Sequence, residues 1–364
     1  MRDSLLIDRW LFLAIALLLA VGVTMVLSTS YLYSQERFTD GTYFFRKQLT
    51  AIGIGTVALA VGLVIPPSGY RRFSYPLLGL TLLVLVLVLV PAIGLARGGA
   101  RRWLSLGGFA FQPAELAKIA LVLYLAHSMA KKEEKIQTFA VGVLPHLIVG
   151  GLLVVLLLLE PDFGTALILG AVLYLMLLIG GVKLTHLLAT GLMALPVLIY
   201  LMLGAEYRMR RLLTFLDPWR EASGSGFQII QSLIAFGSGQ LWGRGLGESR
   251  QKLFYLPEAH TDFVYSVIGE ELGLLGAFVV IALFGVIVVR GLRLTARIEE
   301  PFEQYLAFGL TVLLGLQSLI HMAVVMGLMP TKGLVLPFIS YGGSAMVINL
   351  TEAGILLGLS RRRL

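Results

Sequence analysis

The stretch that decides the fold is WLFLAIALLLAVGVTMVLSTS, residues 10–30, which contains no charged side chain. A helix of about 20 mostly apolar residues is long enough to cross the hydrocarbon core of a bilayer. The residues before it are too polar for the apolar part of a signal peptide, and no small-residue cleavage pattern follows it. The stretch therefore predicts a first transmembrane helix rather than a cleaved leader.

Similar apolar runs recur along the whole chain. Their approximate limits are 10–30, 48–66, 74–95, 114–130, 140–159, 164–182, 184–204, 263–290, 303–327 and 338–360. No barrel-type strand alternation is present, so the runs predict an all-α polytopic membrane protein of about ten transmembrane helices, forming one integral membrane domain over residues 1–364. The composition agrees, because only 14% of the residues are charged, against about 25% in soluble domains.

Composition also restricts the chemistry. The chain has no cysteine, which excludes disulfides, iron–sulfur clusters and thiolate zinc sites. The net charge of +8 on a membrane protein indicates anionic membrane lipid or an anionic substrate, rather than nucleic acid, as a partner. The sequence contains no phosphate-binding loop, dinucleotide fingerprint, serine nucleophile elbow or kinase motif.

Charge placement predicts the orientation. An even number of spans puts both termini on one side. The basic residues of that side are Arg2, Arg9, Arg71, Arg72, Lys131, Lys132, Lys135, Arg290, Arg293, Arg297 and the tail RRRL. Because these lie in short loops, the positive-inside rule predicts that both termini are cytoplasmic.

One long loop, about residues 205–262, follows the seventh span on the outer side. Loops of this length are usually functional. Within it, YRMRRLLTFLDP (207–218) has the pattern of a basic amphipathic helix, and FQIIQSLIAFGSG (227–239) has apolar residues at helical spacing.

Several ionisable residues border the apolar runs, where such groups are costly and are treated first as functional candidates. Glu115 and Lys118 share one helix face, so they form either a structural ion pair or part of a site. Asp162, in EPDFGT, either caps the sixth helix or faces a cavity. Arg102, in GARRWL, is either an interfacial anchor or a clamp for a phosphate group.

One further segment combines polar residues with membrane depth. In GLMPTKGLVLPFISYGGSA (327–345), prolines, glycines and Lys332 interrupt an apolar region, which is tolerated only where backbone is buried in protein or lines a cavity. His321 precedes this segment and is more typical of a packing residue than of a catalyst.

The stretch LFYLPEAHTDFVYSVIGEELG (253–273) is rich in acids beside an apolar run. Asp262 can cap the following helix, but Thr261 can do so too, which makes capping alone a weaker explanation for the acid. Glu270 and Glu271 are adjacent and point to different faces, so at least one must face protein or water.

Together these motifs resemble the SEDS family of bacterial cell-wall proteins (shape, elongation, division and sporulation). The matching stretches are GARRWLSLGGFAFQPAELAK, EPDFGT, DPWREASGSGFQIIQSLIAFGSG, GESRQKLFYLPEAHTDFVYSVIGEELG and PTKGLVLPFISYGGSA. They occur in family order from the first span to the last, and are most like the division member. The chain departs from the family at His321, where Asn is common.

The resemblance implies a peptidoglycan glycosyltransferase. Such enzymes polymerise lipid II, a disaccharide-pentapeptide on an undecaprenyl diphosphate, on the outer face of the bacterial cytoplasmic membrane, together with a class B penicillin-binding protein and, at the division septum, other divisome membrane proteins. It also implies that Asp262 is the essential acid and that Glu115, Lys118 and Asp162 are functionally important.

The residue chemistry suits this expectation. Asp262 is the candidate general base for the acceptor hydroxyl. The diphosphate leaving group needs positive charge. The outer-side candidates to supply it are Arg102, Arg208, Arg211, Arg244, Arg250, Lys252 and Lys332. A divalent cation (Mg²⁺ or Mn²⁺) can share this task, although no set of metal ligands is evident.

Three alternatives remain open. A flippase would move lipid II across the membrane, but it needs a midplane site reachable from both faces, whereas these residues cluster at the outer end. A scaffold would only recruit the transpeptidase. The third alternative is the elongation role of the same enzyme, which only the likeness of the motifs distinguishes from the division role.

Overall fold

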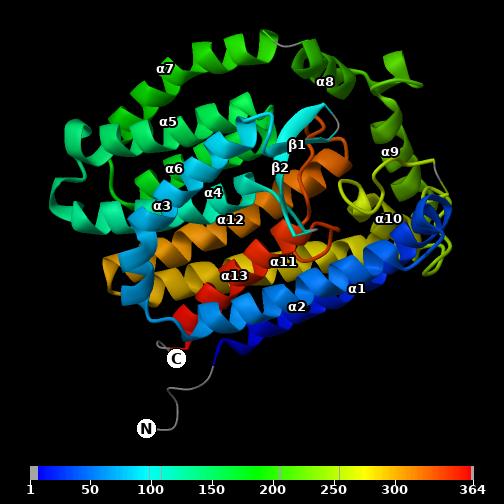
Figure 1. Ribbon diagram of the computed structural model, residues 1–364, viewed down its shortest axis with the longest axis horizontal. Helices are drawn as coiled ribbons and strands as arrows, with labels where there is room; N and C mark the ends of the chain where they lie inside the picture. The colour runs from blue at the N-terminus through cyan, green and yellow to red at the C-terminus, as the bar shows by residue number, and fades with distance from the viewer. Residues whose placement is uncertain (1–6, 98, 108, 205, 254, 362–364) are drawn as a thin grey trace.

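The structure is a computed structural model that describes residues 7–97, 99–107, 109–204, 206–253 and 255–361. Arg2 and residues 362–364, used above for the orientation, lie outside the described residues. Each of the ten predicted runs contains a long helix, and together these form a bundle (Figure 1). They are α1 (Arg9–Phe38), α2 (Tyr43–Val64), α3 (Pro67–Leu89), α4 (Pro113–Lys131), α5 (Leu144–Leu159), α6 (Phe163–Ile179), α7 (Leu184–Leu203), α11 (Gly273–Arg297), α12 (Pro301–Val325) and α13 (Gly343–Ser360).

The helices confirm the predicted fold class. Among the described residues, eight helices are long and apolar enough to cross a membrane, one of them counted together with the π-helical turn η3 (Phe139–Val143) that precedes α5. Of the other two, α6 is apolar but shorter, and α4 carries Glu115 and Lys118. A short 3₁₀ turn, η2 (Glu133–Lys135), follows α4.

Two predicted boundaries were wrong. The eighth run is divided into α10 (Val264–Glu271) and α11. The break is at Gly273, which has φ +70°, and a Cβ there would lie 2.3 Å from the backbone nitrogen of Gly243. The last helix begins at Gly343 rather than at 338, because the Pro- and Gly-containing segment before it is irregular.

A small β-sheet was not predicted. Residues treated above as a loop form the antiparallel strands β1 (Gly94–Arg97), β2 (Ala100–Leu106) and β3 (Phe109–Phe111), in the order β1-β2-β3. The turns between them use Gly99 and Gly107, whose φ values of +80° and +56° are left-handed. Such short strands offer too few alternating positions to be recognised from the pattern alone.

The long outer loop has its own structure, as predicted. It contains α8 (Glu206–Leu216), the 3₁₀ turn η4 (Pro218–Glu221) and α9 (Phe227–Gly239). The start of α1 and the end of α13 lie together at the opposite end of the bundle (Figure 1). There the backbone N–H of Asp8 donates to Ser360 Oγ at 3.1 Å, and the Asp8 carboxylate pairs with Arg290. Both termini are thus on one side, as an even number of spans requires.

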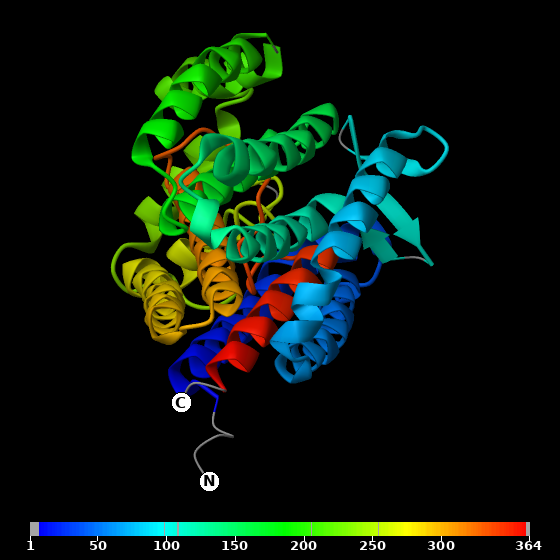
Figure 2. The same cartoon turned by 90° about the vertical axis from the view of Figure 1, so that its left-hand side faces the viewer.

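Burial differs widely between the spans. α13 packs along α2, and in Figure 2 α7 lies at the outer edge. Of an apolar 18-residue stretch of each helix, the share buried inside the protein is 72% in α13 and 67% in α12, but only 6% in α7. The exposed surface of α7 is apolar, which suits contact with lipid.

Candidate functional site

Asp262 lies in the loop before α10, opposite the irregular segment that precedes α13. A Cβ on Gly333 would be 3.4 Å from Asp262 Oδ2. No side chain caps α10, whose N-cap residue is Phe263. The helix-capping alternative for Asp262 is therefore not realised, and its carboxylate is available for another task.

The surroundings of Asp262 change its acidity. Burial, and next the charge of Glu258, raise the pKa of Asp262 to about 7, while the positive charges of Arg211 and Arg102 oppose that rise. An acid that is half ionised near neutral pH can accept and release a proton under physiological conditions.

The backbone on either side of Asp262 is bound to the same irregular segment. Tyr341 N donates to His260 O at 2.9 Å, and Ser340 Oγ donates to Thr261 O at 2.7 Å. The His260 ring packs against Tyr33, Phe44 and Tyr341, and burial lowers its pKa.

A cationic cavity of about 220 Å³ lies between α6, α7, α8 and residues 330–332. Its lining residues are Phe163, Gly164, Leu167, Met202, Tyr207, Arg208, Arg211, Pro330, Thr331 and Lys332. The cations of Arg208 and Lys332 lie 5.7 and 5.9 Å from the centre of the Phe163 ring. Burial lowers the pKa of Lys332 to about 8. The cavity thus combines an apolar wall with three positive side chains.

A second cavity, of about 550 Å³, shares Tyr207 and Arg211 with the first and extends to the β-sheet and to Arg102. Arg102 Nε donates to Glu160 O at 2.9 Å, and its Nη2 donates to Pro161 O. Arg102 therefore braces the turn between α5 and α6, and its charge still acts on Asp262.

Asp162 is the N-cap of α6, which confirms the capping alternative. Its carboxylate accepts from Thr165 N at 3.1 Å and from Thr165 Oγ1 at 2.9 Å. Gln112 Nε2 donates to it at 3.4 Å. The neighbouring Glu160 was not singled out from the sequence, although it stands in the same EPDFGT motif. Burial, and next the charge of Asp162, raise the pKa of Glu160 to about 8.

Glu115 and Lys118 form the predicted ion pair, with Lys118 Nζ 2.8 Å from Glu115 Oε2. Lys118 is only 2% exposed and also donates to Gln317 Oε1 at 2.7 Å. Glu352 of α13 is within electrostatic range of both charges and is fully buried. The pair therefore lies in a buried polar cluster between α4, α12 and α13, which the sequence showed only in part.

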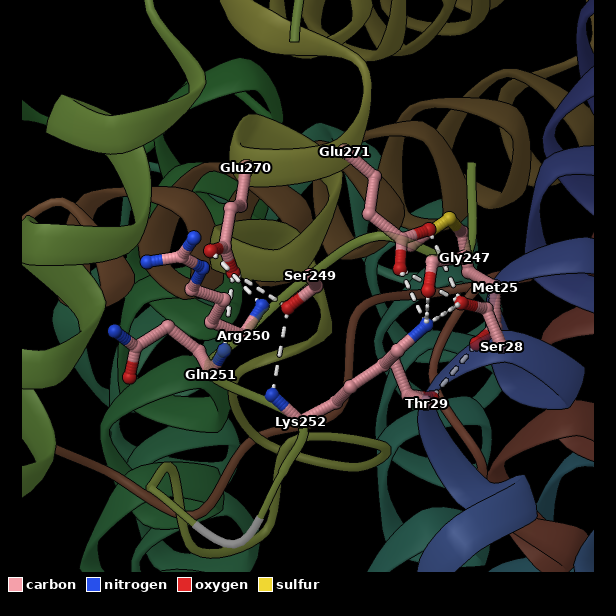
Figure 3. A network of polar contacts seen from close by, with 10 residues as sticks. All are labelled: Met25, Ser28, Thr29, Gly247, Ser249, Arg250, Gln251, Lys252, Glu270 and Glu271. Carbon is pink, nitrogen blue, oxygen red and sulfur yellow. Dashed lines mark hydrogen bonds and ion pairs between the residues drawn. The ribbon is translucent and has the colours of Figure 1, made fainter. Parts of the chain in front are cut away.

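Lys252 lies in a different network, which Figure 3 shows, and Arg244 lies in the same outer loop. Lys252 Nζ is 3.0 Å from Glu271 Oε1 and donates to Ser28 Oγ of α1 at 3.0 Å. Arg244 is exposed, and its Nε lies 3.4 Å from Ser238 O. Neither residue lines the two cavities described above.

Glu270 and Glu271 are both buried, in line with the expectation that at least one faces protein. Figure 3 shows that they point to different groups. Glu270 accepts from Ser249 Oγ and from the backbone N–H groups of Arg250 and Gln251. The two acids thus attach the outer loop and α1 to α10.

The described residues contain no group of three or more His, Cys, Asp and Glu side chains that could hold a metal ion. A divalent cation would therefore need oxygen ligands from elsewhere, such as the phosphates of a substrate.

Comparison with known proteins gives a consistent result. The family model described as "Cell cycle protein" (FtsW, RodA and SpoVE) matches residues 9–364. The probable peptidoglycan glycosyltransferase FtsW of Geobacter sulfurreducens is 47% identical over 97% of this chain and 94% of its own length. Stage V sporulation protein E of Bacillus subtilis is 37% identical over 97% of both chains.

Solved structures agree with the sequence relatives. RodA of Thermus thermophilus is 29% identical and superposes with a TM-score of 0.72 over 98% of this chain and 97% of its own. A chain from a structure described as a peptidoglycan synthase complex that coordinates polymerization and crosslinking is 29% identical, with a TM-score of 0.79 over 98% of both chains. The chain described here belongs to the FtsW/RodA/SpoVE family.

Proposed function

We propose that this chain polymerises lipid II on the outer face of the bacterial cytoplasmic membrane, with Asp262 as the general base. Its family makes it a multi-pass membrane protein and a peptidoglycan glycosyltransferase. The observation that carries the residue assignment is the position of Asp262 against Gly333, in surroundings where burial and Glu258 raise its pKa to about 7 against the opposing charges of Arg211 and Arg102.

In the proposed reaction, the GlcNAc 4-hydroxyl of the acceptor attacks the anomeric carbon of the donor sugar. Asp262 takes the hydroxyl proton as the new glycosidic bond forms. The bond from the anomeric carbon to the diphosphate breaks, and its electron pair leaves with the diphosphate. A diphosphate is a good leaving group, so the protein mainly needs to stabilise its negative charge.

The cationic cavity fits the donor diphosphate. Arg208, Arg211 and Lys332 provide positive charge, and the planar guanidinium groups can donate two parallel hydrogen bonds to a phosphate. Leu167 of α6 and Met202 of α7 provide an apolar wall toward the lipid-facing helices. We place the diphosphate in this cavity and the polyprenyl chain along the apolar surface of α6 and α7.

The remaining predicted residues take different places in this proposal. Arg102 acts on Asp262 through its charge and on the α5–α6 turn through its hydrogen bonds. Asp162 holds the start of α6, and Glu115 and Lys118 act from within the bundle. Lys252 and Arg244, expected above to bind substrate, make contacts within the outer loop and α10 and lie outside both cavities, so we assign the diphosphate to the cavity cations first.

We also propose a class B penicillin-binding protein as a partner, because a structural neighbour comes from a complex that couples polymerization with crosslinking. The FtsW names of several relatives favour a role in septal wall synthesis over the elongation role.

The decisive experiment is polymer formation from lipid II by the purified chain, with and without the partner. We expect Asp262→Asn to reduce polymerisation by about 10²-fold or more, while the variant stays folded in detergent. Polymerisation close to the unsubstituted rate would refute the general-base role. Movement of lipid II across vesicle membranes without any polymer would instead support a flippase.

A further inference from the structure

The irregular segment that faces Asp262 is held by two side chains of α12. Gln317 Nε2 donates to Val335 O at 3.1 Å, and His321 Nδ1 donates to Leu334 O at 2.7 Å. Residues 330–336 belong to no helix or strand. Buried backbone carbonyls without such partners are costly, so these two side chains stabilise the path of the segment inside the bundle.

The other end of Gln317 binds the buried ion pair. Lys118 Nζ donates to Gln317 Oε1 at 2.7 Å and lies 2.8 Å from Glu115 Oε2. An amide side chain has one accepting end and one donating end. Because the ammonium group takes the oxygen, the NH₂ group must point the other way, toward Val335 O. The ion pair therefore fixes the orientation of an amide that holds the irregular segment.

The segment in turn holds the loop of Asp262. Leu336 N donates to Ser340 Oγ at 2.9 Å, and Ser340 Oγ donates to Thr261 O at 2.7 Å. Thr261 immediately precedes Asp262, and Gly333 lies against the Asp262 carboxylate. Hydrogen bonds, joined by the covalent backbone between Val335 and Leu336, thus lead from Lys118 through Gln317 to the backbone beside Asp262.

We propose that Gln317 is a positioning residue for the glycosyl transfer. It holds residues 333–336 so that the Asp262 carboxylate points at the acceptor hydroxyl, and the Glu115–Lys118 pair acts on the reaction through this amide. The inference rests on the proposed role of Asp262 as general base. A displacement of a catalytic group by about 1 Å can cost about 10²-fold in rate, so Gln317 need not contact the substrate to matter.

The test compares Gln317→Leu with Ser318→Ala in the purified full-length chain supplied with lipid II. Ser318 is a suitable control because it is similarly buried on the same helix, and its hydroxyl donates within that helix, to Gly315 O. We expect Gln317→Leu to lower kcat by about 10- to 100-fold with little change in KM. Ser318→Ala should leave both constants unchanged.

Two further measurements distinguish positioning from a general loss of stability. The acidic limb of the pH–rate profile should move in Gln317→Leu, because the surroundings of Asp262 change. The amide hydrogens of Leu334 and Leu336 should exchange faster. A merely structural role would lower the folded fraction but leave the pH midpoint of the folded molecules in place.

Gln317→Glu tests the donating end of the amide separately from its accepting end. It keeps an oxygen for Lys118 and removes the donor to Val335 O, so we expect it to share the kcat loss. If Gln317→Leu does not fold, Gln317→Glu and Gln317→Met provide the same comparison.

The inference is overturned if the folded Gln317 variants match Ser318→Ala in kcat, pH midpoint and hydrogen exchange. Asp262→Asn distinguishes this failure from that of the proposed function. If Asp262→Asn remains active, the general-base assignment fails. If Asp262→Asn is inactive while the Gln317 variants behave like the control, only the positioning role fails.

Discussion

Lys252 and Glu271 form an ion pair with 3.0 Å between Nζ and Oε1, and their side chains are 8% and 0% exposed. Ser28 Oγ of α1 donates to the same carboxylate at 2.8 Å. The pair therefore joins the outer loop, the short helix α10 and the first span. Breaking a buried pair by removing one partner leaves the other charge uncompensated, which is strongly destabilising.

We expect Lys252→Met to destabilise the protein by about 3–5 kcal/mol. Adding Glu271→Met should recover most of this loss, because the uncompensated carboxylate is then gone. Thermal unfolding in detergent provides the measurement. A Lys252→Met protein of normal stability that binds lipid II poorly would show that Lys252 contacts the substrate after all.

The pH dependence of polymerisation should report Asp262. A general base works in its ionised form, so kcat/KM should rise with pH through about 7, the pKa of Asp262. Glu258→Gln removes a negative neighbour, which favours ionisation, and should shift this limb to lower pH. Glu248→Gln, an exposed acid of the same loop, serves as the control. An unchanged limb in Glu258→Gln would contradict the assignment of the limb to Asp262.

Lys332 should produce the alkaline limb. Its pKa of about 8 means that the ammonium group loses its proton, and its attraction for the diphosphate, as the pH rises through about 8. We expect kcat/KM to fall there. Lys332→Arg should abolish this limb, since guanidinium stays charged, and Lys332→Met should raise KM at every pH. An alkaline limb that persists in Lys332→Arg would have another origin.

Two substitutions of Asp162 distinguish its helix-capping role from a role of its negative charge. Asp162→Ala removes the acceptor for Thr165 N and should cost about 1 kcal/mol. Asp162→Asn keeps a side-chain oxygen there, so we expect nearly normal stability and activity. A stable Asp162→Asn protein with strongly reduced polymerisation would show that the negative charge itself acts at the site.

Much of this molecule could be predicted from local patterns. Each span is a continuous apolar run, and an amphipathic or capped segment such as α8 or the start of α6 is specified by residues next to one another. The pairing of Glu115 with Lys118 is local too, because positions i and i+3 share a helix face. Asp262 was predicted as a site residue from its acid-rich motif and from the family resemblance, and its role stays a prediction.

Other features depend on residues that are far apart in the chain. The sequence did not reveal that Lys252 would contact both Glu271 and Ser28, because Ser28 is on α1, far away in the chain. The three-stranded sheet was missed because its strands are short and are stabilised by pairing with each other.

Hydropathy along the chain was sufficient to determine a bundle of membrane helices, because transfer into lipid is decided segment by segment. Only the tertiary structure decided which polar groups meet inside that bundle. Gln317 carries no signal of function in the sequence, yet it lies between Lys118 and Val335 O. Hydrogen bonds require close approach and correct orientation, and helix packing alone brings these distant groups together.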